Sequence, residues 1–205
     1  MDIVTRRYTR SLELESWSQG DDLALIVIRK PARESGTASL KTEDGLWSYA
    51  PRADRLLRIP PGLLSEGWMG SHISNDDLLR DSSWQRDFDT SLQESNEGGR
   101  PVLRLVAVPK PDTPIVYSKI IWTVDAKTLL PLRSEDFDGE KVARTTTFSD
   151  IKDIGGRQLP TTIKVVPTKY PEESTIMRYQ TMVFDAPISS TMFTPRGLKK
   201  AAKRR

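Results

Sequence analysis

The longest apolar run in the chain is Leu23-Ala24-Leu25-Ile26-Val27-Ile28. Six consecutive apolar residues leave neither side of a strand polar, so this run predicts a central strand that is covered on both faces. Pro31 ends the strand, because proline cannot donate a backbone hydrogen bond to a neighbouring strand. The fold is therefore expected to be built around a β-sheet that contains this run.

The segments around this run also have strand patterns. Residues 8–15 alternate between apolar and polar side chains, and an Asp-Gly turn signal at residues 42–45 separates short strands at 37–41 and 46–49. Glycine pairs and Asp-Gly turns continue to punctuate the chain, which predicts a large antiparallel meander. The further expected strands are residues 55–59, 102–108, 115–124, 129–137, 142–151, 158–166 and 175–184.

One segment breaks the strand pattern. Residues 60–70 combine Pro, Gly and Ser with the large apolar side chains of Leu63, Leu64, Trp68 and Met69, which predicts an irregular segment near the surface that could act as a lid. Ser74, with an acidic residue three positions later, predicts the cap of a short helix that runs to about residue 79.

Composition fits a single domain. The chain has 205 residues, 37% of them hydrophobic, with a formal net charge of +3, and its mean hydropathy is -0.49. All-β domains of this length are common, so residues 1–198 are expected to form one domain. Much of the excess positive charge lies in residues 199–205, which are expected to form a basic, solvated tail.

The search for catalytic chemistry finds few candidates. The chain has no cysteine, and His72 is its single histidine. Asp76, Asp77 and Asp81 follow His72, but carboxylates at the start of a helix are explained by the helix dipole. No phosphate-binding or dinucleotide-binding motif is present. We therefore expect a non-enzymatic protein with no cofactor and no metal.

Several segments together resemble the LolA-like outer-membrane lipoprotein-sorting proteins. The shared pattern runs G-T-A-x-L, W-x-Y-x-P, R-I and F-M-G-S-D-x-S-x-x-D-L. His72 stands where the family usually has Asp, and Asn75 where it usually has an aromatic residue. The matching segments of this chain, in order, are Gly36–Leu40, Trp47–Pro51, Arg58-Ile59, Trp68–Leu78, Tyr117–Lys119, Trp122, Asp125, Leu130–Leu132, Gly156–Pro160 and Phe193-Thr194.

This resemblance implies a mainly β fold in which a curved antiparallel sheet forms an incomplete, unclosed β-barrel with a few short helices as a lid. It implies a periplasmic carrier, with its signal peptide already removed, that holds lipoprotein acyl chains or another lipid for transfer toward the outer membrane. Bulky apolar side chains are the expected lining of the cavity and lid. These candidates are Trp47, Tyr49, Leu63, Leu64, Trp68, Met69, Phe88, Trp122 and Met182.

Two alternatives remain open at this stage. The first is a non-enzymatic accessory or interaction module for inner-membrane transporter components, with residues 68–78 as its docking surface. The second is an enzyme on the same fold, with His72 and the nearby carboxylates at its site. No nucleic-acid partner is expected, because basic residues interleaved with aromatic residues do not gather on one face. The chain contains no run of about 20 apolar residues, so the sequence predicts no membrane-spanning helix.

Overall fold

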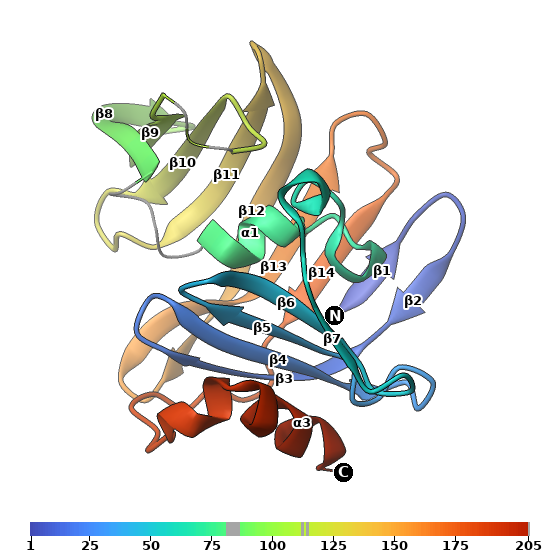
Figure 1. The fold of residues 1–205 in the computed structure, drawn as a ribbon. Coiled ribbons are helices and arrows are strands. Elements are labelled where there is room, and N and C mark those ends of the chain that lie inside the picture. Colours follow the sequence, from blue (N-terminus) through green and yellow to red (C-terminus); the bar gives the residue numbers. More distant parts are fainter. Residues whose placement is uncertain (81–86, 112, 114, 205) are drawn as a thin grey trace. The chain divides into compact units, whose positions relative to one another are not determined.

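The computed structural model describes residues 1–80, 87–111, 113 and 115–204. These residues form two antiparallel β-sheets and a few short helices (Figure 1). Neither sheet closes on itself within this part of the chain. The expected fold class, mainly β with an unclosed antiparallel sheet, is confirmed.

The chain forms two compact units. The first comprises residues 1–2, 10–83 and 185–205, and the second comprises residues 3–9 and 84–184, as far as these residues are described. The five-stranded sheet lies in the first unit, and strands β8 to β14 of the nine-stranded sheet lie in the second. The expectation that residues 1–198 form one domain stays a prediction.

The five-stranded sheet contains the apolar run that opens the sequence argument. Its order is β3 (Glu13–Gln19), β4 (Leu23–Lys30), β5 (Ala38–Thr42), β6 (Gly45–Ala50) and β7 (Arg55–Arg58). Strand β4 lies between β3 and β5 and contains the whole run, so the predicted central strand is confirmed. The predicted hairpin is also present, because Thr42 pairs with Gly45 across the turn between β5 and β6.

The register of this sheet assigns its side chains to two faces. Directly paired residues of antiparallel strands lie on the same face. Leu25, Leu40 and Trp47 therefore share one face, which we call the α3 face. Ile26 and Ser39 share the other, which we call the Ser39 face.

The C-terminal helix α3 (Pro195–Lys203) covers the α3 face (Figure 1). Thr194 caps this helix by accepting a hydrogen bond from the backbone N–H of Gly197, and Pro195 occupies its first turn, where a missing N–H costs nothing. The helix is preceded by a 3-10 turn, η3 (Ser190–Phe193). The buried core beneath α3 consists of Leu25, Val27, Ala38, Leu40, Tyr49, Phe193, Leu198, Ala201 and Ala202.

The expectation of a solvated, frayed terminus is wrong for residues 199–203. These residues complete α3, and Ala201 and Ala202 are 3% and 9% exposed. Two alanines between basic residues are too weak an apolar signal to reveal the helix. The helix forms because Leu198 and these alanines lie on one side at helical spacing and meet the α3 face.

The nine-stranded sheet is built from antiparallel hairpins. It curves from β14 to β8 (Figure 1). Its order is β2 (Thr9–Ser11), β1 (Asp2–Val4), β14 (Ser174–Arg178), β13 (Arg157–Pro167), β12 (Lys141–Ile154), β11 (Pro131–Asp138), β10 (Lys119–Asp125), β9 (Arg100–Pro109) and β8 (Phe88–Glu97).

Two predicted strands differ from the structure, and strand β8 (Phe88–Glu97) was not predicted. The strand expected at 8–15 is divided between β2 and β3, and the strand expected at 175–184 ends at Arg178. Strand β8 was not predicted, because most of its residues are polar and exposed. It exists because ten residues of β9 pair with it, which illustrates how tertiary context overrides β-propensity.

The burial of α3 can be tested with Leu198→Ala. Leu198 is fully buried on the side of α3 that faces the sheet. The substitution is therefore expected to lower the free energy of unfolding by about 2–5 kcal/mol. Lys200→Ala is the matched control on the same helix, because Lys200 is exposed, and it is expected to change stability by less than about 0.5 kcal/mol. Urea unfolding measures both values. Equal stabilities would show that α3 does not belong to the core.

Candidate functional site

The loop that begins the Trp68–Leu78 motif packs on the Ser39 face of the five-stranded sheet. The backbone N–H of Trp68 donates to the carbonyl of Ile73 at 2.7 Å, and η2 (Trp68–Gly70) forms between them. A side chain at Gly67 would lie 2.2 Å from the carbonyl oxygen of Ser71, so this turn requires glycine. The Trp68 indole Nε1–H donates to Ser39 Oγ at 2.9 Å.

The expected surface position of Trp68 is therefore wrong, because its side chain is 4% exposed. An indole ring is mostly apolar with one N–H donor, and it is buried readily when that donor has an acceptor. Ser39 supplies the acceptor. Trp68→Asp, which would otherwise be an obvious test of cargo binding, would place a carboxylate in this buried position and disturb folding as well.

A short helix, α1 (Asn75–Arg80), follows this loop. Its start is a reciprocal cap, as predicted: the Asp77 N–H donates to Ser74 Oγ at 3.1 Å, and the Ser74 N–H donates to Asp77 Oδ2 at 2.6 Å. Asp81 lies outside the described residues. Among the described residues, no group of three His, Cys, Asp or Glu side chains is arranged to hold a metal ion.

One face of the sheet in the second unit carries a row of paired residues. Residues that pair directly across neighbouring strands form a row on this face, and we call it the Trp122 face. The row starts with two leucines and a tryptophan and continues with small or β-branched residues. Its members, from β8 to β14, are Leu92, Leu105, Trp122, Ser134, Thr146, Val165 and Thr175.

A second row lies beside the first. Phe148, Ile163 and Met177 pair directly across β12, β13 and β14 and share this face. The rings of Trp122 and Phe148 stack with their centroids 5.2 Å apart, although β11 separates their strands. Strands lie about 4.8 Å apart, so the two rings reach each other over the small side chain of Ser134. The result is a mainly apolar surface, which also includes the buried ion pair between Arg144 and Asp136.

The opposite face of the same sheet carries charges. Arg133 donates to both carboxylate oxygens of Glu97, at 2.5 and 2.7 Å, and its Nε lies 3.6 Å from Glu135. These hydrogen bonds from Arg133 lower the pKa of Glu97. Arg100 pairs with Asp125 at 2.7 Å. We call this the Arg133 face, and it also carries Val102 and Thr123, which are buried.

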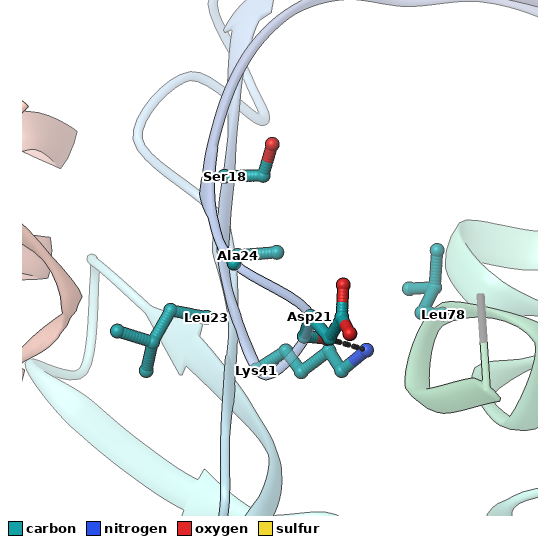
Figure 2. A pocket seen from close by; sticks show the side chains of 7 residues that line it. Ser18, Asp21, Leu23, Ala24, Lys41 and Leu78 are labelled. Atoms are coloured by element: carbon teal, nitrogen blue, oxygen red, sulfur yellow. Dashed lines mark hydrogen bonds between the residues drawn. The ribbon is translucent and has the colours of Figure 1, made fainter. Parts of the chain in front are cut away.

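A small pocket lies at one end of the five-stranded sheet. Figure 2 shows Leu78 of α1 opposite Lys41, whose ammonium donates to the backbone carbonyl of Asp21 at 2.8 Å. The pocket has a volume of about 280 Å³ and is also lined by Ser18 and Ala24. Small-molecule sites span roughly 300–1,000 Å³ and are mainly apolar. This pocket mixes polar and apolar groups, so we place the candidate site on the Trp122 face instead.

Three solved structures share this fold. The first, a domain from Vibrio parahaemolyticus provisionally described as an outer membrane lipoprotein-sorting protein domain, is 23% identical, with a TM-score of 0.82 over 97% of this chain and 88% of that one. A DUF1329 family protein from Desulfovibrio piger is 24% identical, with a TM-score of 0.85 over 96% and 88%. A LolA superfamily protein from Nitrosomonas europaea is 19% identical, with a TM-score of 0.78 over 94% and 86%. The predicted LolA-like fold is confirmed.

A family model described as "Uncharacterized protein" matches residues 20–200, which is most of the chain. The chain belongs to this family. No curated protein matches it. The family match and the three structures together define a member of this family with a LolA-like fold.

Two residues predicted to line a cavity in this LolA-like fold lie against α3. Trp47 and Tyr49 are on the α3 face, Tyr49 is 2% exposed, and its hydroxyl donates to Asp54 at 2.8 Å. Burial, with the Asp54 carboxylate beside it, raises the pKa of Tyr49. Hydrogen bonds from Lys199 and then Tyr49 lower the pKa of Asp54. The structure therefore places Trp47 and Tyr49 on the face opposite Trp68.

The remaining predicted residues are scattered. Leu63 is 47% exposed, Leu64 is half-buried beside it, and half-buried Met69 is in a left-handed conformation with φ 54°. Phe88 is buried at the start of β8 and Met182 lies in an irregular segment, not on a strand as predicted. Trp122 and Phe88 are on the Trp122 face. The role of all nine residues in ligand binding stays a prediction.

Sequence reasoning missed several residues of the Trp122 face. Leu92 lies in polar β8, and Leu105, Phe148 and Ile163 lie in predicted strands without a signal that separates them from ordinary core residues. Their alternation was visible, but the partner of each residue was not. A register that aligned the predicted strands would have found this row.

Ser39→Ala tests the contact that holds the Trp68 loop on its sheet. The substitution leaves a buried indole N–H without its acceptor and is expected to cost about 1–3 kcal/mol of unfolding free energy. Ser48→Ala is the matched control, because Ser48 is the direct partner of Ser39 across β5 and β6. Urea unfolding followed by tryptophan fluorescence compares the two. A Ser39 variant as stable as the control would contradict this role of the hydrogen bond.

The hydrogen bonds of Asp125 lead us to expect that the stability of the protein depends on pH. It accepts hydrogen bonds from the backbone N–H and hydroxyl of Thr128 and from Arg100, and these lower its pKa far below the ordinary value. A lowered folded-state pKa stabilises the protein above the unfolded-state pKa of about 3.9, and this contribution is lost as pH falls below it. Asp125→Asn should lower the melting temperature equally at pH 7 and pH 5 and by progressively less below pH about 4. Thermal unfolding across this range measures the difference, and a gap that stays constant down to pH 3 would contradict the assignment.

Proposed function

We propose that the protein is a non-enzymatic carrier that holds the acyl chains of a lipoprotein, or another lipid, on the Trp122 face. The observation that carries this proposal is the apolar row that begins with Leu92, Leu105 and Trp122 and the adjoining row that begins with Phe148. Leu92 is 61% exposed on this face. An exposed leucine that continues a row of buried and half-buried apolar residues extends a binding surface more readily than it stabilises a core.

The chemistry of an acyl chain suits such a surface. An acyl chain gains about 0.8 kcal/mol for each CH₂ group removed from water. Its binding therefore requires contiguous apolar contact and no catalytic group. The stacked rings of Trp122 and Phe148 and the flexible side chain of Met177 provide large, polarisable contacts of this kind.

The cargo, location and partners belong to the same proposal. The fold is shared with a domain provisionally described as lipoprotein-sorting, which supports a periplasmic carrier that moves lipid toward the outer membrane. In the described residues, no helix is both long enough and apolar enough to cross a membrane. The role of Leu63, Leu64 and Met69 as a lid stays a prediction from the sequence.

Native mass spectrometry is the first test of this proposal. Protein purified from a bacterial host is expected to carry a lipid or an acylated peptide, which organic extraction and a second mass measurement would identify. Wild-type protein that is consistently free of bound lipid, and that does not take up an added fluorescent fatty acid, would overturn the proposal.

Leu92→Glu tests the position of the binding surface. The carboxylate would lie beside the bound acyl chain, and the affinity for a fluorescent fatty acid is expected to fall by about tenfold or more. Val108→Glu is the matched control, because Val108 is 45% exposed on neighbouring β9 but lies on the Arg133 face. Its affinity should stay within about twofold of the wild-type value. Equal losses in the two variants would exclude the Trp122 face as the site.

A further inference from the structure

The outer side of α3 is entirely basic. Arg196, Lys199, Lys200 and Lys203 are spaced three and four residues apart, so they lie together on the side of the helix opposite Leu198. Arg196, Lys200 and Lys203 are exposed, and the Lys199 side chain is 37% exposed. The helix contains no acidic residue.

Folding does not explain this arrangement. Basic residues stabilise the last turn of a helix through its dipole, which accounts for Lys200 and Lys203. Arg196 lies in the first turn, where a positive charge is unfavourable. The pairs Arg196–Lys200 and Lys199–Lys203 also place like charges four residues apart, which destabilises an isolated helix. The fold tolerates this repulsion because Leu198, buried against the sheet, holds the helix in place.

The basic side of the helix continues onto neighbouring loops of the same unit. Lys199 Nζ lies 2.9 Å from Asp54, which places the turn between β6 and β7 beside α3. Arg52 lies two residues before Asp54 and is exposed. Arg52 Nη2 donates to the backbone carbonyl of Arg33, whose side chain is 81% exposed.

We propose that this surface docks the protein on an anionic lipid bilayer. We call it the basic surface, and it consists of Arg33, Arg52, Arg196, Lys199, Lys200 and Lys203. Clusters of four to eight basic residues on an amphipathic helix are attracted to anionic headgroups. The apolar side of α3 is buried in the protein core and cannot enter the membrane, so docking is peripheral, electrostatic and sensitive to salt.

The composition of the basic surface favours a bilayer over a nucleic acid. Proteins that bind single strands combine cations with aromatic side chains on which bases stack. None of the six residues is aromatic, and Tyr49 beneath Lys199 is 2% exposed. The ammonium groups stand on flexible stems that hold a point charge without fixed geometry. An array of this kind fits a laterally mobile layer of headgroups.

The experiment compares two triple variants of the full chain. Arg196→Gln, Lys200→Gln and Lys203→Gln together remove three charges from the basic surface. Lys127→Gln, Lys141→Gln and Lys152→Gln remove three exposed charges from the second unit and form the control. Both variants have a formal net charge of 0 in place of +3. Cosedimentation measures binding to vesicles of phosphatidylcholine alone and to vesicles in which about a third of the lipid is phosphatidylglycerol.

The wild type and the control are expected to bind the anionic vesicles, and the α3 variant at least about tenfold more weakly. Binding should disappear in about 0.5 M salt, because the Debye length is then only a few ångströms. Equal binding by both triple variants, equal binding to neutral vesicles, or a single-stranded oligonucleotide that displaces the vesicles would overturn the proposal. Fatty-acid binding by the α3 variant should match the wild type, so failure of docking and failure of the carrier proposal are distinguishable.

Discussion

The alternation of side chains along each strand is the constraint on which the rest of this structure depends. A strand sends successive residues to opposite faces, and the register decides which residues of neighbouring strands meet. In the five-stranded sheet, this separates Leu40, which contacts the core beneath α3, from Ser39, which accepts a hydrogen bond from Trp68. In the nine-stranded sheet, it separates Trp122 and Ser134 from Arg133 and Glu135.

The short elements of the first unit depend on that separation. Helix α3 has nine residues, too few for an isolated helix to be stable in water. It is held by Leu198, Ala201 and Ala202 against apolar residues of the α3 face. The Trp68 loop is held on the other face by one buried hydrogen bond and by its own backbone turns. The sheet therefore organises two segments that carry little structure by themselves.

The two faces of the nine-stranded sheet also differ in the side chains that they carry. The Arg133 face carries ion pairs, one between neighbouring β9 and β10 and one between Arg133 of β11 and Glu97 of β8. The Trp122 face instead places large apolar side chains in adjacent rows, with the exposed Leu92 at one end. The outer side of α3 carries basic residues that the fold does not require. Both features fit the proposed lipid carrier, which would combine apolar contact with acyl chains and electrostatic contact with headgroups.

The sequence by itself determined the fold class, the central strand, the Glu43-Asp44 turn and the Ser74–Asp77 cap, because each depends on local periodicity or on turn and capping chemistry. The ordered motif series also indicated the LolA-like fold. Tertiary structure alone decided that Trp47 and Tyr49 face α3, that Trp68 is buried and that residues 199–203 are helical. It also decided that Leu92, Leu105 and Trp122 form one row. These facts depend on which distant segments pair, and pairing is set by register and long-range packing that no local pattern records.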